Sequence, residues 1–288
     1  MKPARFEYHV VRKVDEALAL LAEHGDEAKV LAGGQSLVPL LNFGLAAPAH
    51  LVDLNRIEDL AYVRRQEGVL HVGAMTRQAT LEASGVVARH WPLLIAALKL
   101  VAHPQIRNRG TVGGSLAHAD PAAELPVAGA ALDARFHVRS TRGARTLTWS
   151  ELFVTHLTTA LEPDELLVDI EVPPLPPGTG WAFAEFSRRH GDFGLGGAAA
   201  LVTADGDVCR EVRIALLGAG ATPVRATEAE RSLAGGRVDE RSAAEAGRLA
   251  VAGIRPPGDM HGSSEYRTDL IEAMVRRALL DAAARVRR

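Results

Sequence analysis

The sequence predicts an α+β protein in two parts, and three observations support this prediction. Short β-rich runs alternate with amphipathic helices through the first half of the chain. A segment of prolines and glycines, PPLPPGTG at 173–180, then interrupts the alternation. After it, β-rich residues come first and helix-forming residues follow. We therefore expect two domains, 1–175 and 176–288.

Composition and charge narrow the class of protein. Lys and Arg number 33 against 35 Asp and Glu, a formal charge of -2, so no bulk attraction to nucleic acid or to an anionic membrane is expected. The single cysteine, Cys209, excludes an internal disulfide, and any iron–sulfur centre must lie on a partner. Residues 1–21 mix charged and apolar side chains, which predicts neither a signal peptide nor a membrane span. A cytoplasmic protein is expected.

The first helix is predicted at 14–25. This segment places Ala17, Leu18, Leu21 and Ala22 on one helical stripe, and Gly25 stands where a C-terminal cap belongs. AKVLAGG and HLVDLNRI then indicate short strands bounded by glycine or polar residues. The segment GVLHVGAMTRQATLEAS indicates a strand, a turn and the start of a helix. The chain thus opens as an alternation of strands and helices.

A buried helix is predicted to begin at Pro92. Pro104 forbids its continuation, so the segment after Pro104 is expected to be a loop. The segment ALDARFHVRSTRGARTLTWSELF predicts two strands joined through Gly143, and ELLVDIEVP predicts a further strand that ends at proline. The first half closes there.

The second half is predicted to be β-rich first and helical afterwards. Within residues 180–226 the sequence ADGDV has the composition of a hairpin turn between two strands. The final segment, 265–288, predicts a helix with an apolar face made of Leu270, Ile271, Met274, Ala278 and Leu279.

Two glycine-rich stretches point to a phosphate-containing ligand. A backbone that approaches a phosphate closely needs glycine, because a Cβ atom would block the approach and the turn must point successive N–H groups at one anion. AGGQS (32–36) fits this need, although on these five residues alone a tight turn between a strand and a helix is the favoured interpretation. RNRGTVGGSLAHADPAAELP (107–126) repeats the design. Two such loops suggest two sides of one extended anionic ligand, for which a pyrophosphate-bridged dinucleotide is the natural candidate.

These two stretches resemble the flavin-binding medium subunit of the molybdenum hydroxylases, the family that includes carbon monoxide dehydrogenase and xanthine dehydrogenase. The resemblance extends in order through HLVDLNRI, GAMTRQATLE, ELLVDIEVP, EFSRRHGDFGLGGAAA and YRTDLIEAMVRRAL. It implies a PCMH-type, vanillyl-alcohol oxidase-like flavin domain with lobes at about 1–56 and 57–175 and FAD between them. A smaller α+β domain with an antiparallel sheet is implied to follow.

The resemblance also implies which residues bind FAD. The first pyrophosphate loop would be Ala32, Gly33, Gly34, Gln35 and Ser36, flanked by Leu31 and Leu37, and the second would be Thr111, Gly113, Gly114 and Ser115. Asp120 would lie by the ribityl and phosphate part of the cofactor, the backbone near Leu166 by the adenine, and Arg188 near the flavin. His103 is included as a residue adjacent to the cofactor, with a solvated turn as the alternative. One departure is Gly44, which stands where many relatives carry a basic residue.

The function implied by the resemblance is electron transfer within a larger oxidoreductase. A small partner would carry 2Fe–2S clusters and a large partner a molybdopterin-type molybdenum cofactor, with the complex assembled as a dimer of heterotrimers. FAD on this chain would collect electrons and pass them to an external acceptor, and no side chain need act as a nucleophile. Two alternatives stay open: a self-sufficient small-molecule flavin oxidoreductase, and an adaptor that has kept the fold and lost the cofactor. The substrate and the final acceptor are not predicted.

Two other motifs have rival interpretations. LLGAGATPV (216–224) partly matches a nicotinamide dinucleotide fingerprint, but Pro223 replaces the third glycine and no βαβ unit follows, so a strand and turn are favoured. In HADPAAE, His118, Asp120 and Glu124 could bind a metal ion or act as acid and base. Because Asp120 and Pro121 are typical of a helix N-terminus, a helix cap beside the cofactor is the preferred interpretation.

Overall fold

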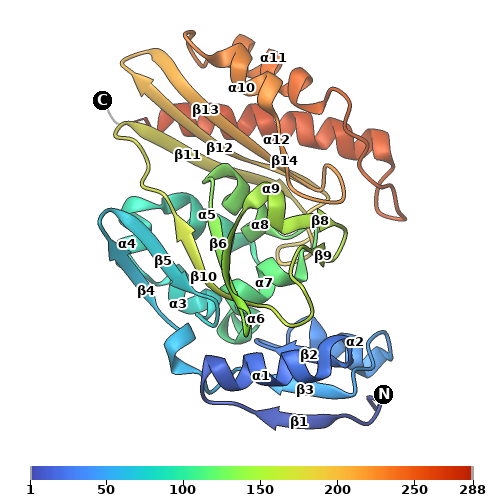
Figure 1. Cartoon of the computed structure of the whole chain (residues 1–288). Helices are drawn as coiled ribbons and strands as arrows, with labels where there is room; N and C mark the ends of the chain where they lie inside the picture. The colour runs from blue at the N-terminus through green and yellow to red at the C-terminus, as the bar shows by residue number, and fades with distance from the viewer. Residues whose placement is uncertain (1, 287–288) are drawn as a thin grey trace.

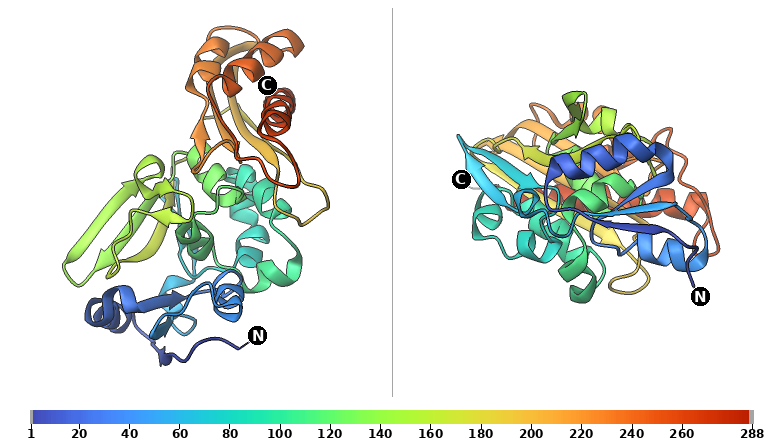
Figure 2. Two further views of the ribbon diagram at one scale, coloured as in Figure 1. Left: turned by 90° about the vertical axis from the view of Figure 1, so that its right-hand side faces the viewer. Right: turned by 60° about the horizontal axis from the view of Figure 1, so that its bottom comes forward.

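The computed structural model describes residues 2–286, which form three stacked regions. The N-terminal lobe, a second lobe and a C-terminal sheet with its helices follow one another from bottom to top in Figure 1, and the left view of Figure 2 shows the same order. The α+β prediction is confirmed. Within the described residues, no helix combines the length and apolar character needed to cross a bilayer.

The N-terminal lobe is a small parallel sheet covered by a helix. Its strands and helices are β1 (Glu7–Val10), α1 (Val14–His24), a 3₁₀ turn (Gly25–Glu27), β2 (Ala28–Leu31), α2 (Leu37–Phe43) and β3 (His50–Asp53). The central strand is β3, which pairs in parallel with both β1 and β2. The predicted helix is confirmed, with Ala17, Leu18 and Leu21 buried against the sheet. Gly44 ends α2 with φ of +72°, a left-handed conformation that explains glycine there.

The second lobe is an antiparallel sheet with helices on one face. The sheet order is β4 (Val63–Gln66), β5 (Val69–Gly73), β10 (Leu166–Val172), β6 (Arg135–Ser140) and β7 (Gly143–Thr148). The helices are α3 (Gln78–Glu82), α4 (Gly85–His90), α5 (Pro92–Leu100), α6 (Pro104–Arg109), α7 (Val112–His118), α8 (Glu124–Ala131) and α9 (Trp149–Leu152). A 3₁₀ turn (Glu58–Leu60) and the short pair β8 (Phe153–Thr155) and β9 (Thr158–Thr159) complete it.

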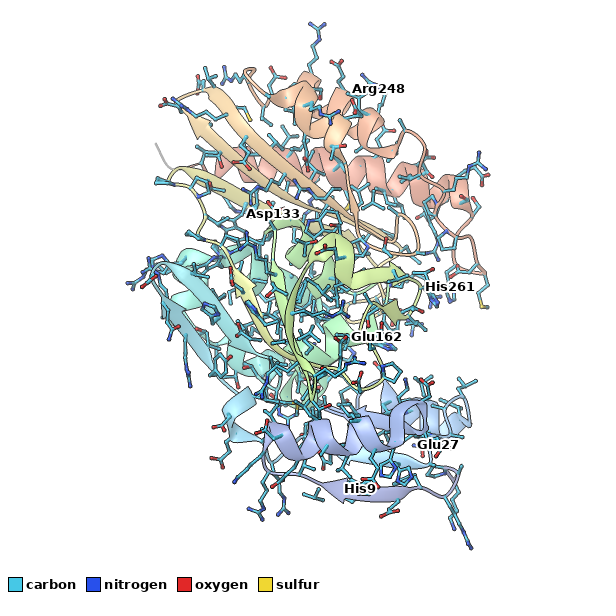
Figure 3. All side chains as sticks on the ribbon, in the orientation of Figure 1. His9, Glu27, Asp133, Glu162, Arg248 and His261 are labelled. Atoms are coloured by element: carbon cyan, nitrogen blue, oxygen red, sulfur yellow. The ribbon has the colours of Figure 1, made fainter. Side chains whose placement is uncertain are left out.

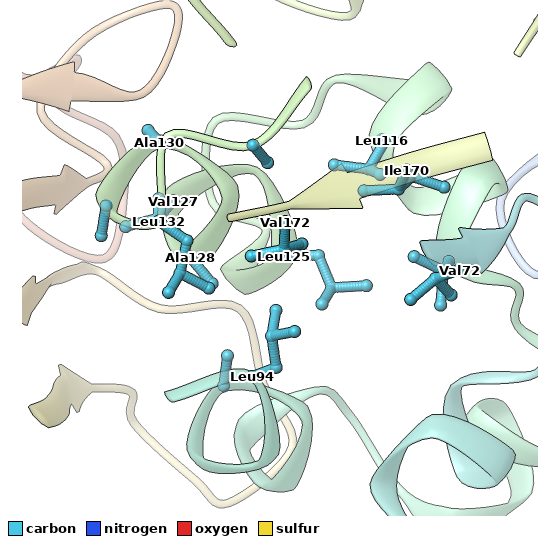
Figure 4. Packing of buried hydrophobic residues seen from close by; sticks show 14 of the residues in the cluster. Val72, Leu94, Leu116, Leu125, Val127, Ala128, Ala130, Leu132, Ile170 and Val172 are labelled. Atoms are coloured by element: carbon cyan, nitrogen blue, oxygen red, sulfur yellow. The ribbon is translucent and has the colours of Figure 1, made fainter. Parts of the chain in front are cut away.

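The core of this lobe joins the sheet to its helices. Figure 4 shows Val72 and Ile170 of the sheet near Leu94, Leu116 and Leu125 of the helices, and all five belong to one buried cluster. Because these apolar side chains are removed from water together, their burial is the main force that holds the helices on the sheet.

The loop expected after Pro104 is wrong, because two helices follow it. Proline is excluded from a helix interior but fits the first turn, where its missing N–H has no partner to lose. Pro104 therefore ends α5 and also begins α6 at the N1 position. Thr111 then caps α7, with its Oγ1 accepting a hydrogen bond from the Gly114 N–H.

The C-terminal region is an antiparallel sheet buried on both faces. It contains β11 (Thr179–Phe186), β12 (Gly196–Asp205), β13 (Val208–Leu217), β14 (Val224–Arg225), α10 (Thr227–Leu233), α11 (Glu240–Val251) and α12 (Ser264–Ala284). The predicted hairpin turn joins β12 to β13. Ala199 and Leu201 of β12 belong to the core of the second lobe, whereas Ala198 and Ala200 face α12. The second lobe therefore packs directly on this sheet.

The final helix differs from its prediction in which residues are buried. Val275 and Ala282 are buried together with Ile271, Ala278 and Leu279. Leu270 and Met274 are only half-buried. Helix α12 contacts α11 as well as strands β11 and β12. Its buried surface is therefore broader than the single apolar stripe that was predicted.

Candidate functional site

The first glycine stretch forms a turn with unused backbone donors. Residues 32–36 connect β2 to α2, and Gly34 takes φ of +74°, which only glycine adopts readily. Among residues 2–286, none accepts a hydrogen bond from the N–H groups of Gly33, Gly34, Gln35 or Ser36. Successive N–H groups in such a turn form a concave site for an anion. The expectation that this loop can hold a phosphate therefore has a structural basis.

The second glycine stretch uses most of its donors within the protein. The Gly113 N–H donates to the Ala74 carbonyl over 2.8 Å, and the Gly114 N–H donates to Thr111 Oγ1 over 3.0 Å. A Cβ atom on Gly113 would lie 2.6 Å from the Ala74 Cβ, so packing alone requires glycine there. The Thr111 N–H and the Ser115 hydroxyl have no hydrogen-bond partner within the described chain. These two groups, not the glycine amides, are the donors that this loop can offer.

The two glycine loops lie against each other. A Cβ atom on Gly33 would be 2.5 Å from the Arg109 carbonyl oxygen and 2.8 Å from the Gly110 Cα. A Cβ atom on Gly114 would be 3.4 Å from the Ala32 Cβ. Segments far apart in the sequence thus meet with backbone touching backbone, and the absence of side chains is what permits the contact.

Two polar side chains hold these loops together. Asn55 Nδ2 donates to the Ala32 carbonyl over 2.9 Å, and Arg77 donates to Asn55 Oδ1 over 2.6 Å. The guanidinium of Arg77 also donates to the Arg109 carbonyl. We call Asn55 and Arg77 the loop clamp. The sequence alone did not reveal the loop clamp. Asn55 simply follows strand β3, and Arg77 follows the turn after β5.

A buried carboxylate, that of Asp53, hydrogen-bonds to the loop clamp residue Asn55. Asp53 is 8% exposed and accepts hydrogen bonds from the Tyr8 hydroxyl and, over 2.9 Å, from the Asn55 backbone N–H. Burial alone would raise the pKa of Asp53, but the hydrogen bonds from Tyr8 and Asn55 outweigh it and lower the pKa. The charged form of Asp53 therefore fixes the orientation of Asn55.

Helix α7 connects the loops to the C-terminal region. One strip of this helix carries small residues, the half-buried Gly114 and Ser115 and the exposed Ala117, followed by the half-buried His118. From Thr111 to Asp120 the chain covers about 14 Å at helical rise. A long ligand that begins at the glycine loops can therefore follow this strip.

Asp120 does not cap a helix as expected. Its Oδ1 accepts from the Ala122 N–H over 2.9 Å and closes a local turn, whereas α8 begins later, with Ala123 at its N-cap. Ala119 takes φ of +52° and ends α7, so the chain needs several residues to turn before α8 can start. The prediction of a cap was wrong, and the half-buried Asp120 carboxylate stays beside the end of α7.

His103 and the segment that contains Arg188 lie against each other. A Cβ atom on Gly191 would lie 2.2 Å from His103 Cε1, and the His103 and His190 rings are 6.3 Å apart with planes 21° from parallel. Arg188 is half exposed and lies 3.8 Å from the Asp192 carboxylate. The residues of the two glycine loops thus form one group, and His103 with the Arg188 segment forms another.

The remaining predicted site residues are Leu31, Leu37 and Leu166. Leu31 ends β2 and Leu37 begins α2, so both flank the first turn. Leu166 starts β10, and its side chain is 5% exposed within the core of the N-terminal lobe. Only the Leu166 backbone is therefore placed to meet a ligand.

Two buried carboxyl groups lie between the second lobe and the C-terminal sheet. Burial, opposed by a local backbone hydrogen bond and aided by Asp120, raises the pKa of Glu124 to about 7. Burial, with the nearby Glu124 charge, raises the pKa of Glu185 to about 8. Glu185 Oε2 has no hydrogen-bond partner in the described residues. Both carboxyl groups are therefore more easily protonated than ordinary glutamates. Glu185 was not among the residues predicted from the sequence.

The two rival motifs do not form the sites considered for them. His118, Asp120 and Glu124 are not among the clusters of potential metal ligands that the described residues form. The segment 216–224 runs from β13 through a turn to β14 of the antiparallel sheet, as favoured for it, and contains no βαβ unit.

Comparison with known proteins covers both halves of the chain. Residues 4–175 match the family described as FAD binding domain in molybdopterin dehydrogenase, and residues 181–282 match the CO dehydrogenase flavoprotein C-terminal domain. The chain is 49% identical to the 6-hydroxypseudooxynicotine dehydrogenase complex subunit alpha of Paenarthrobacter nicotinovorans, over 100% of this chain and 97% of that protein. It is 39% identical to the carbon monoxide dehydrogenase medium chain of Hydrogenophaga pseudoflava, over 99% of each. A solved carbon monoxide dehydrogenase from that organism, lacking the Mo-pyranopterin moiety of its cofactor, superposes with a TM-score of 0.97 at 40% identity over 100% of both chains.

Proposed function

The chain belongs to the family of FAD-binding medium subunits of molybdenum hydroxylases, and from this we propose how its residues hold FAD and pass electrons. The first glycine loop, from Ala32 to Ser36, binds the diphosphate of FAD through its unpaired N–H groups. Thr111 and Ser115 complete this end of the site. The single observation that carries the proposal is the run of free amide donors where the two loops touch.

The far end of α7 is the proposed place for the flavin. Asp120 lies beside the ribityl and phosphate part, and His103 and Arg188 lie near the ring system. The Leu166 backbone lies by the adenine. A positive charge such as Arg188 stabilises negative charge that develops on a reduced ring.

FAD, when bound, supplies a group that exchanges electrons singly or in pairs, which no side chain of this chain can do. Cys209, the only cysteine of the sequence, is buried in the C-terminal region, so the chain offers no thiolate set for a cluster. We therefore assign the 2Fe–2S clusters to a small partner and the molybdenum cofactor to a large one. A dimer of such heterotrimers, in the cytoplasm, is the proposed assembly.

Substrate choice is assigned to another subunit. Relatives that match this chain over its whole length belong, by name, to enzymes that act on a nicotine derivative and on carbon monoxide. The same flavin-subunit fold occurs in enzymes with such different substrates. We therefore infer that this chain does not bind the substrate that is oxidised. A self-sufficient flavin oxidoreductase has no comparable support, since both relatives are named as parts of larger enzymes.

The test is purification of the chain from the cells that make it. We expect near-stoichiometric flavin by its visible spectrum, together with a small cluster-containing protein and a large molybdenum-containing protein that co-elute. Electrons from the reduced complex should bleach the flavin band. A catalytically competent chain that elutes alone would instead favour the self-sufficient enzyme, and a complex without flavin would contradict the proposal.

A further inference from the structure

Three histidines converge in the N-terminal lobe, away from the glycine loops. His9 of β1, His24 at the end of α1 and His50 of β3 each place a ring nitrogen within 4.8 Å of the others. The His9 and His50 side chains are only 17% exposed. Figure 3 shows His9 in the N-terminal lobe, beneath α1. We call His9, His24, His50 and the adjacent Glu7 the histidine cluster.

The parallel sheet itself assembles the cluster. Glu7 pairs with His50 across β1 and β3, and His9 lies two residues further along β1, so all three side chains share the face that α1 covers. The Glu7 carboxylate lies 3.9 Å from His9 Nε2 and 3.7 Å from His50 Nδ1. One anionic group thus stands beside two imidazoles on a rigid backbone.

Within the described residues, the ring nitrogens of the histidine cluster are only partly paired with protein atoms. His9 Nε2 and His50 Nδ1 lie 3.1 Å apart, and this contact satisfies one nitrogen of each ring. Within residues 2–286, neither ring nitrogen of His24 hydrogen-bonds to a protein atom. The His24 ring instead stacks on His50, with centroids 3.7 Å apart.

A second histidine cluster provides the contrast. On the outer face of the five-stranded sheet, His71 Nδ1 lies 2.8 Å from Asp169, and His137 Nε2 lies 2.9 Å from Glu171. The other nitrogen of His137 meets the Thr146 hydroxyl at 3.0 Å. Hydrogen bonds to carboxylates explain this second cluster without a further ligand. In the first cluster the only adjacent carboxylate within the described residues, Glu7, lies 3.7–3.9 Å from the ring nitrogens, which is beyond hydrogen-bond distance.

We propose that the histidine cluster binds a divalent transition-metal ion of the zinc class. Zinc takes imidazole nitrogens at about 2.0–2.1 Å in tetrahedral geometry, which places two such ligands about 3.3 Å apart. The separation of His9 Nε2 from His50 Nδ1 is 3.1 Å. Neutral imidazole and carboxylate together suit zinc, and a site made only of oxygen ligands would suit magnesium or calcium instead.

Binding requires one local change. Parallel rings 3.7 Å apart cannot both direct their in-plane lone pairs at one point, so the His24 ring must turn out of its stack on His50. His24 is the last residue of α1 and is half-buried, with Gly25 next in the chain. It therefore has room to reorient. The ion would then join the end of α1 to β1 and β3 and stabilise the lobe that carries the first glycine loop.

The experiment uses the untagged full chain, freed of metal by a chelator and titrated with Zn²⁺ alone. One equivalent should bind, and at about a hundredfold excess over Kd the unfolding midpoint should rise by about 5–10 °C. Co²⁺ should give the visible absorption of a tetrahedral nitrogen and oxygen site. His9→Gln, His24→Gln and His50→Gln should each weaken Zn²⁺ binding about tenfold or more.

His156→Gln is the matched control, because His156 is exposed and lies outside the cluster. It should leave the Zn²⁺ affinity and the midpoint shift unchanged. The His24→Gln variant guards against misfolding, because it alters only a helix end. Unchanged affinity in any of the three cluster variants, or equal binding to a variant lacking all three histidines, would overturn the proposal. Flavin content is measured in parallel, so loss of the metal site and loss of the cofactor site are separable.

Discussion

Replacing Gly33 with alanine tests the contact between the two loops most directly. The added Cβ would lie 2.5 Å from the Arg109 carbonyl oxygen, whereas ordinary contact begins at 3.4 Å. Both near neighbours are backbone atoms, so no side chain can swing aside. The loops must separate by about 0.9 Å, and overpacking of this kind costs about 1–3 kcal/mol of stability.

The expected effect on the cofactor is larger than the effect on folding. Separation turns the free amides of the first loop away from the common site, and loss of one hydrogen bond to a charged group is worth about 1.5–3 kcal/mol, or about tenfold to a hundredfold in affinity. Flavin per chain, read from the visible spectrum of the purified complex, should fall sharply in Gly33→Ala.

Gly85→Ala is the control for this experiment. Gly85 begins α4, has no positive φ, and a Cβ there meets nothing within 4 Å. This variant should keep full flavin and an unchanged unfolding midpoint. Full flavin occupancy with native stability in Gly33→Ala would refute the argument, because it would mean that the two loops do not need to touch.

Three further variants test other parts of the structure. Arg77→Ala removes the hydrogen bonds to Asn55 and to the Arg109 carbonyl, and it should lower flavin affinity with little loss of stability. The control Arg64→Ala removes a guanidinium that stacks on Tyr62 and should leave flavin affinity unchanged. Because the pKa of Glu185 is raised from 4.5 to about 8, the folded protein holds a proton that the unfolded chain releases, and stability falls as pH rises between these values. Between pH 6 and pH 9 the free energy of unfolding, measured with urea, should fall by about 2–3 kcal/mol less in Glu185→Gln than in the unchanged protein. An identical pH dependence in the two proteins would contradict this prediction. Arg225→Met leaves the half-buried Glu230 carboxylate without its 2.7 Å guanidinium partner, although the Ile214 N–H still donates to it, and should cost about 3 kcal/mol, measured by chemical unfolding.

Most elements could be predicted from the sequence because their residues report burial directly. The stripe of Ala17, Leu18 and Leu21 marks α1, since one helix face must be dry. Strand β1 gave no such signal. It is an edge strand in which three of four residues are exposed and His9 is half-buried, so apolar and polar residues do not alternate. The prediction of a loop after Pro104 was wrong because proline, which is excluded from the interior of a helix, also fits the first turn of the next one.

The site was predictable in its location but not in the role of each residue. Glycine in a sequence signals that something approaches the backbone closely, without saying whether it is a ligand or the protein itself. At Gly113 the close neighbour is Ala74, and at Gly33 it is the second loop. Only tertiary structure separates these cases, because the partners lie tens of residues away.

The loop clamp explains why the first loop can present its amides at all. The Ala32 carbonyl and the Gly33 N–H belong to one planar trans peptide, so they point in opposite directions. Asn55, which is itself oriented by Asp53, holds that carbonyl on the protein side at 2.9 Å. The Gly33 N–H must therefore face the open side, before any ligand arrives. The site is pre-organised by an amide and a carboxylate that never need to touch the cofactor, which is why glycine spacing alone could not have revealed them.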